Sequence, residues 1–247
     1  MRTSNPALSD DTFTGFGPIA REERMTIQGT ANKALLLLGC TFITAAWTWN
    51  LFYRAMNPQA VLPLLGLGAI GGLIVALVTV FKQSWAPVTA PLYALLEGLV
   101  IGGVSSVAEA QFPGIVIQAV GLTFGTCLAL LLAYKSGLIR ASENFKLGVV
   151  AATGGIALVY LATIILGFFG VRLAFVYQGG PIGIAFSLFV CVIAALNLVL
   201  DFDFIEQGAA SGAPRFMEWY GAFGLMVTLI WLYLEILRLL MKLRSRE

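Results

Sequence analysis

The chain has 247 residues, of which 59% are hydrophobic and 11% are charged, and its formal net charge is +2. Soluble domains contain about 25% charged residues, so the composition indicates one membrane domain with many spans rather than a soluble enzyme. The small net charge argues against nucleic-acid binding. Histidine is absent, which excludes serine–histidine and cysteine–histidine hydrolases, the HExxH zinc site and a histidine pH switch.

The N-terminal segment differs from the rest of the chain because it is polar and lacks the apolar core of a signal peptide. We expect residues 1–33 to form a cytoplasmic tail that is disordered in part, and residues 34–247 to form the membrane domain. Three cysteines, Cys40, Cys127 and Cys191, lie inside apolar stretches, which is typical of small core residues rather than disulfides.

Seven apolar stretches follow, and each approaches or exceeds the roughly 20 residues that a helix needs to cross a bilayer. They predict an all-α, polytopic membrane protein with a seven-helix bundle. The predicted spans are 34–53, 60–81, 85–108, 113–134, 147–169, 181–200 and 218–240. Glycines spaced four residues apart favour close approach of helices in lipid. These pairs are Gly68/Gly72, Gly98/Gly102 and Gly121/Gly125.

Lysine and arginine are concentrated in the loops on the N-terminal side of the predicted spans, which places the N-terminus in the cytoplasm. The basic C-terminal end, with Lys242, Arg244 and Arg246, would then lie outside if all seven segments cross. A re-entrant seventh segment is the alternative; we favour seven crossings.

Acidic residues inside the spans are candidates for binding protons or cations, because an ionised carboxylate in hydrocarbon costs several kcal/mol. Glu97 lies about midway along the third span. It is either functional or a protonated acid bonded to a neighbouring carbonyl. Lys82, at the end of the second span, is the nearest obvious cation, although lysines in such places commonly extend to the interface.

The sixth span ends in a group of polar residues. Asn197 and Asp201 are four residues apart and share one helix face, whereas Asp203 and Glu206 share another. Only one face can point into the bundle, and we expect it to be the face of Asp201. Asp203 and Glu206 are then expected at the cytoplasmic interface.

The last span carries a stripe of small and polar residues every three or four positions, including Glu218, Thr228, Glu235 and Arg238. Such a stripe faces protein or water, so we expect this helix near the centre of the bundle. Alternatively, Arg238 only neutralises Glu235, three residues before it, in a local pair without function.

These C-terminal residues resemble the signature of the transmembrane Bax inhibitor motif family, in a bacterial branch. The segments that carry the resemblance are LDFDFIE at 200–206, EWY at 218–220 and WLYLEILRLL at 231–240. Glu97-Gly98 fits the acidic–glycine position of that family, and the similarity covers residues 34–247.

The resemblance implies a seven-helix fold with the last helix at the centre and a pH-sensitive calcium leak in the bacterial inner membrane. In the family, two carboxylates on helices six and seven share a proton and close the pore, and a basic residue on helix two pairs with them in the open form. By motif, these residues are Asp201, Glu235 and Lys82. The chain departs from the best-studied branch in having Glu as the second acid and a longer connection between the two.

The longer connection leaves the partner of Asp201 open. If the last helix starts at Glu218, then Glu235 lies 17 residues later, or about 25 Å along the axis, and Glu218 is level with Asp201. If the segment before Gly224 lies along the interface, Glu235 moves to mid-membrane instead.

We therefore expect a calcium leak, gated by protonation of Asp201 and Glu235, with no enzymatic activity and no cofactor. Its partners are the lipid bilayer, calcium ions and protons, and the two carboxylates are the expected calcium ligands. Flux would be passive, because no GxxxxGK[ST] motif is present. Further residues of a possible ion pathway are Glu97, Asn197, Asp203, Glu206, Glu218 and Arg238.

Three other functions use the same acids. One is a proton-coupled transporter of a small solute, although no internal repeat is evident. Another is an intramembrane aspartyl protease, although the GxGD context is missing. The third is a membrane regulator that acts through protein contacts.

Overall fold

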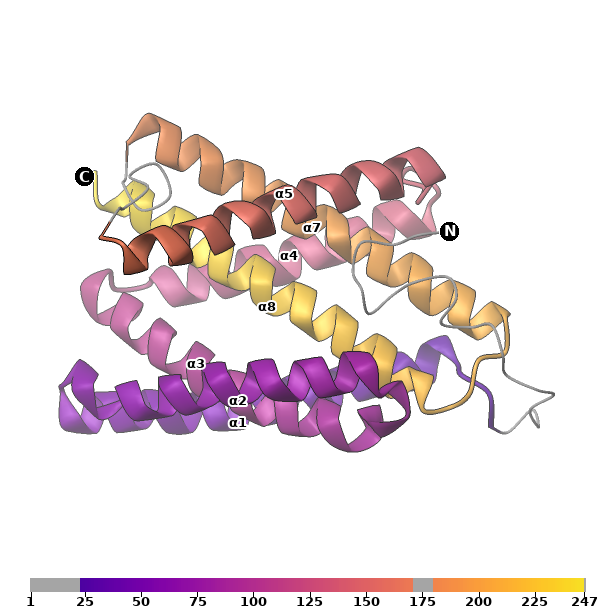
Figure 1. Cartoon of the computed structure of the whole chain (residues 1–247), viewed down its shortest axis with the longest axis horizontal. Helices are drawn as coiled ribbons and strands as arrows, with labels where there is room; N and C mark the ends of the chain where they lie inside the picture. Colours follow the sequence, from indigo (N-terminus) through magenta and orange to yellow (C-terminus); the bar gives the residue numbers. More distant parts are fainter. Residues whose placement is uncertain (1–22, 171–179, 247) are drawn as a thin grey trace. The chain divides into compact units, whose positions relative to one another are not determined.

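The computed structural model describes residues 23–170 and 180–246, and in these residues the chain is built from helices (Figure 1). Seven of the helices are long and apolar enough to cross a membrane, which confirms the predicted all-α membrane fold. They are α1 (Ile27–Ala55), α2 (Leu62–Phe81), α3 (Ala86–Gln111), α4 (Ile115–Lys135), α5 (Glu143–Phe168), α7 (Pro181–Ala210) and α8 (Met217–Arg244). Two short 3-10 helices, η3 (Pro58–Ala60) and η4 (Gln83–Trp85), precede α2 and α3.

Two helices extend seven or more residues beyond their predicted ends. α1 begins at Ile27 instead of 34, because Thr26 caps it with a side-chain oxygen that accepts a hydrogen bond from the backbone of Gly29. α7 continues to Ala210, ten residues past the predicted end at 200. The segment after Asp201 is therefore helical as well, so Asp203 and Glu206 lie on α7.

The described residues divide into two compact units, and we describe each unit by itself. Unit 1 comprises residues 114–202 and 228–246, apart from 171–179, and unit 2 comprises residues 23–113 and 203–227. Both α7 and α8 contribute residues to each unit.

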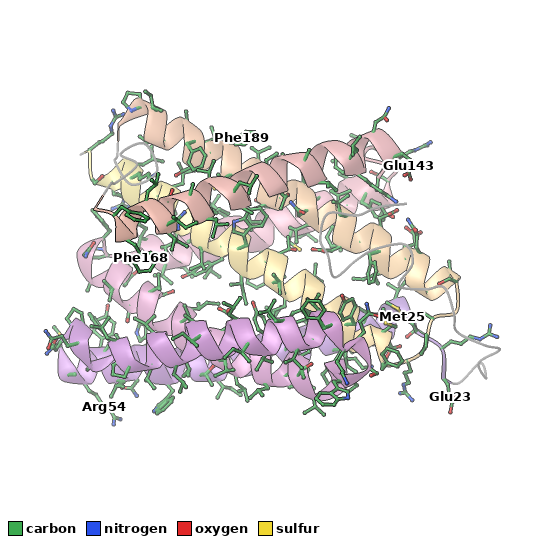
Figure 2. The ribbon with its side chains drawn as sticks, in the orientation of Figure 1. Glu23, Met25, Arg54, Glu143, Phe168 and Phe189 are labelled. Carbon is green, nitrogen blue, oxygen red and sulfur yellow. The ribbon has the colours of Figure 1, made fainter. Side chains whose placement is uncertain are left out.

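Unit 2 contains α1, α2 and α3, which lie side by side (Figure 1). Figure 2 labels Met25, just before α1, and Arg54, at the opposite end of that helix. Glycines allow these helices to approach closely. A Cβ atom at Gly102 of α3 would lie 2.7 Å from the Cα of Ala45 in α1. A Cβ atom at Gly68 of α2 would lie 2.6 Å from a carbonyl of α3.

The expectation of a close contact between helices was wrong for the glycine pair in α4. A Cβ atom at Gly121 or Gly125 would meet nothing within 4 Å in the described part of the chain. The spacing of small residues therefore identifies the tight packing of α3 against α1 and α2, but not a contact of α4.

Unit 1 contains α4, α5, most of α7 and the second half of α8. Figure 2 labels Glu143 and Phe168, which mark the two ends of α5. A cluster of buried apolar side chains joins α5 to α7, and Trp231 of α8 packs against it. The buried members of the cluster are Ile156, Val190 and Ile193.

Burial differs strongly between the helices. In the most apolar window of α8, 61% of the residues are buried, compared with 50% in α3 and α7 and 17–22% in the other four spans. The less buried spans expose many large apolar side chains, among them Phe42, Ile70 and Leu128. Exposed apolar side chains are expected where a helix faces lipid, and a high buried fraction is expected where a helix packs against protein.

Candidate functional site

Asp201 lies in α7 with only 2% of its surface exposed. The hydroxyl of Thr228 in α8 donates a hydrogen bond to its carboxylate. Within the described residues, its second oxygen, Oδ2, has no hydrogen-bond partner. Buried polar atoms are normally satisfied, so an unsatisfied carboxylate oxygen indicates a position where a proton or a cation can bind.

Asn197 lies one helical turn before Asp201 and is also buried. Its amide nitrogen donates to the hydroxyl of Thr153 in α5 and to the carbonyl of Ile193, both at 2.8 Å. The amide therefore fixes α7 against α5, and its donors are engaged away from Asp201.

Glu235 of α8 is equally buried, but its carboxylate has several partners. The phenol of Tyr160 in α5 donates to Oε1 at 2.8 Å, and Nη1 of Arg238 lies 3.0 and 3.1 Å from the two carboxylate oxygens. Nη1 of Arg238 also contacts the phenol oxygen at 2.6 Å. The structure thus contains the local pair of Glu235 and Arg238, with a tyrosine from a second helix added to it.

Asp201 and Glu235 are not joined by a hydrogen bond in this structure. Asp201 bonds to Thr228, which precedes Glu235 by seven residues, or about 10 Å along α8 at about 1.5 Å per residue. Each carboxylate has its own partner at its own level of the helix. The predicted proton-sharing pair therefore stays a prediction for another state of the protein.

The other two acids of α7 are more accessible than Asp201. Asp203 is half-buried and accepts a hydrogen bond from the side chain of Gln207, and Glu206 is exposed. This difference agrees with the expected assignment of the two helix faces.

Glu218, the alternative partner of Asp201, is bound elsewhere. Its carboxylate forms an ion pair with Lys33 of α1 and accepts hydrogen bonds from the backbone nitrogen of Thr26 at 2.9 Å and from its hydroxyl at 2.8 Å. Glu218 therefore ties the start of α8 to the start of α1, within unit 2.

Lys82 caps the C-terminal end of α2, and its ammonium nitrogen lies 5.1 Å from the centroid of the Trp85 ring. This cation–π contact lies within unit 2. The pairing of Lys82 with Asp201, which belongs to unit 1, stays a prediction. Glu97 of α3, half-buried, accepts a hydrogen bond from Tyr93 one turn before it.

Several partners of these acids were not identified as site residues from the sequence. Tyr160 and Lys33 lie far from Glu235 and Glu218 along the chain, and only their polar groups in apolar surroundings could have drawn attention to them. Lys242 was assigned to the basic end of the chain, yet it is buried and donates to the carbonyl of Gly183 and the hydroxyl of Ser187. It fixes the end of α8 to the start of α7.

Among the residues with described positions, no group of three or more His, Cys, Asp or Glu side chains is placed to hold a metal ion. The expected role of Asp201 and Glu235 as calcium ligands stays a prediction.

Comparison with known families identifies the chain over almost its whole length. A sequence model of the family described as "Bax inhibitor 1 like" matches residues 5–245. No curated protein and no solved structure is significantly similar to the chain. The match includes all seven membrane-spanning helices and the segments around Asp201 and Glu235, and the chain therefore belongs to the Bax inhibitor 1 like family.

Proposed function

We propose that this protein is a pH-sensitive calcium leak in which calcium moves passively and the binding of a proton by Asp201 closes the pathway. The supporting observation is the buried Oδ2 atom, which has no partner among the described residues. The proposal includes no enzymatic step and no cofactor.

Calcium is a hard cation that prefers oxygen ligands, and the carboxylate of Asp201 and the hydroxyl of Thr228 supply such oxygens. Protonation makes the carboxyl neutral and removes its attraction for a cation. Low pH therefore closes the pathway, and flux rises as the pH rises.

Glu235 has a different part in this proposal. Arg238 neutralises it in the described state, so the pair adds little net charge to the pathway. Proton sharing between Asp201 and Glu235 would require Arg238 to release Glu235. Lys82 is then the cation that stabilises the ionised acids in the open form, as the resemblance implies.

The location of the protein also belongs to the proposal. Seven apolar helices make it a multi-pass membrane protein. The distribution of lysine and arginine favours a cytoplasmic N-terminus, and the bacterial branch of the family favours the inner membrane.

The proposal is tested by calcium flux into proteoliposomes between pH 5 and 8. Asp201→Asn is permanently neutral at this position, so its flux should be low and independent of pH. Glu235→Gln leaves Arg238 without its carboxylate, and the unpaired cation should lower calcium flux about tenfold while the response to pH persists.

Glu23→Gln is the control, because it removes an exposed carboxylate that lies before α1 and outside the possible ion pathway. Its flux should equal that of the wild type at every pH. A pH response that survives the double variant Asp201→Asn/Glu235→Gln would place the gate elsewhere. Proton flux that depends on an added solute would favour a transporter.

A further inference from the structure

A second carboxyl group lies within unit 2, far from any cationic side chain of the helices around it. Glu97 of α3 is half-buried, and its side chain crosses to α2 at Gly72. A Cβ atom at Gly72 would lie 3.1 Å from Oε1 of Glu97. The glycine therefore provides the space that the carboxyl group occupies.

The depth of Glu97 follows from its neighbours in the other two helices. The next residue in α3, Gly98, faces Thr41 and Thr44 of α1, and Gly72 is the neighbour in α2. These positions are close to the middle of both helices. Glu97 thus lies near the mid-plane of the three helices.

The nearest cationic side chains lie at the helix ends. At about 1.5 Å per residue, Lys82 is ten residues, or about 15 Å, beyond Gly72, and Arg54 is ten residues, or about 15 Å, beyond Thr44. Lys33 is eight residues, or about 12 Å, before Thr41 and is paired with Glu218. At that depth, none of the three helices supplies a positive charge.

The other titratable groups around Glu97 are few. Tyr93, which is 6% exposed, donates a hydrogen bond to the carboxylate and packs against Phe223 of α8 with ring centroids 5.0 Å apart. Glu109 lies twelve residues, or about 18 Å, further along α3. In the part of α8 that belongs to unit 2, the acid is Glu218, which Lys33 neutralises.

From this geometry we propose that Glu97 and Tyr93 form a second proton-binding site, independent of Asp201, in which the carboxyl group of Glu97 is protonated in the resting protein. An unpaired carboxylate in hydrocarbon costs several kcal/mol, and a proton removes this cost without a counter-ion. The phenol then remains as the hydrogen-bonding partner of the neutral acid. The inference does not depend on the calcium leak.

A fluorescent hydrophobic carbodiimide in detergent or vesicles tests the site, because it reacts with protonated carboxyl groups in apolar surroundings. The carboxylic proton moves to a carbodiimide nitrogen, and the carboxyl oxygen adds to the central carbon. The adduct rearranges to a stable N-acylurea without a leaving group. We expect the label on the peptide that contains Glu97 at pH 7, and its loss in Glu97→Gln.

Asp201→Asn is the matched control, and at least 80% of the Glu97 labelling should remain because the two sites are independent. Loss of Glu97 labelling in Asp201→Asn would contradict this independence, whatever the calcium flux of that variant. Calcium should not reduce the labelling of Glu97. If it does, calcium and not a proton is the resting ligand of this carboxyl group, and the proposal is wrong. Absence of label on Glu97 in the wild type would overturn the proposal.

Infrared difference spectra give a second readout that does not depend on access of the reagent. The wild type minus Glu97→Gln spectrum should contain the carbonyl stretch of a protonated carboxylic acid at pH 7. A carboxylate band in its place would overturn the proposal. A monodisperse elution profile of the variant would show that the difference does not come from unfolding.

Discussion

At the scale of single residues, the buried acids differ chiefly in their partners. Glu218 and Glu235 each have a cation within reach, whereas Asp201 has a threonine hydroxyl and one oxygen without a partner among the residues that the structure describes. A paired carboxylate contributes to stability, and removal of one partner leaves an uncompensated charge. Similar burial therefore accompanies different roles.

The ion pair between Glu218 and Lys33 leads to a stability prediction. Glu218→Gln leaves the half-buried ammonium of Lys33 without its counter-charge, and it should lower the free energy of unfolding by about 2 kcal/mol. Thermal unfolding of the purified protein in detergent measures the change. Lys33→Met/Glu218→Met should be more stable than Glu218→Gln, because it removes both charges together.

Glu23→Gln is again the suitable control, since it changes an exposed glutamate before α1. Its stability should stay within about 0.5 kcal/mol of the wild type. Equal stabilities of Glu218→Gln and Glu23→Gln would show that the ion pair does not stabilise the described state.

At the scale of helices, the hydropathy pattern predicted all seven spans because each is apolar over the thickness of a bilayer. The ends of the helices were less predictable. Thr26 extends α1 toward the N-terminus by capping it, and α7 continues through Asp203, which is half-buried, and Glu206, which is exposed. A charged residue in the sequence therefore indicates how deep that position lies in the membrane, but it does not show where the helix ends.

Glycines in α3 and α4 give a prediction with a built-in control. Gly102→Ala would place a Cβ atom 2.7 Å from the Cα of Ala45 and should cost about 1–3 kcal/mol, because two backbones would have to separate. Gly125→Ala meets open space, so it should be neutral or stabilise α4 by up to about 1 kcal/mol. Thermal unfolding in detergent compares them, and equal losses would contradict the assigned contact.

The candidate site was predictable in part. The sequence identified Asp201 and Glu235 because an acid between apolar residues is visible in any hydropathy pattern. It did not identify Tyr160, which lies 75 residues before Glu235, or the division of the two carboxylates between two levels of α8. Such pairings depend on helix rotation and tilt, which packing sets and which local sequence does not encode.

At the scale of the whole molecule, an odd number of crossings has a consequence for topology. If all seven spans cross, the exposed residues Gln28 and Ser136 lie on one side of the membrane, and the exposed residues Gln59 and Ser245 lie on the other. The basic C-terminal end would then be external, against the usual preference.

Cysteine labelling measures this topology. Single cysteines at positions 28, 59, 136 and 245, in a background without the three natural cysteines, should react with a membrane-impermeant maleimide in an alternating pattern. In intact cells, only the variants at 59 and 245 should be labelled. Labelling at 59 without labelling at 245 would favour a re-entrant last segment.

In both α7 and α8, the boundary between the two units lies close to one hydrogen bond. α7 leaves unit 1 after Phe202, and α8 enters it at Thr228, so both boundaries adjoin the hydrogen bond between Asp201 and Thr228. One such bond contributes about 1 kcal/mol, which corresponds to about a fivefold change in a two-state equilibrium. Loss of this one bond would therefore shift a two-state equilibrium that depends on it by about that factor.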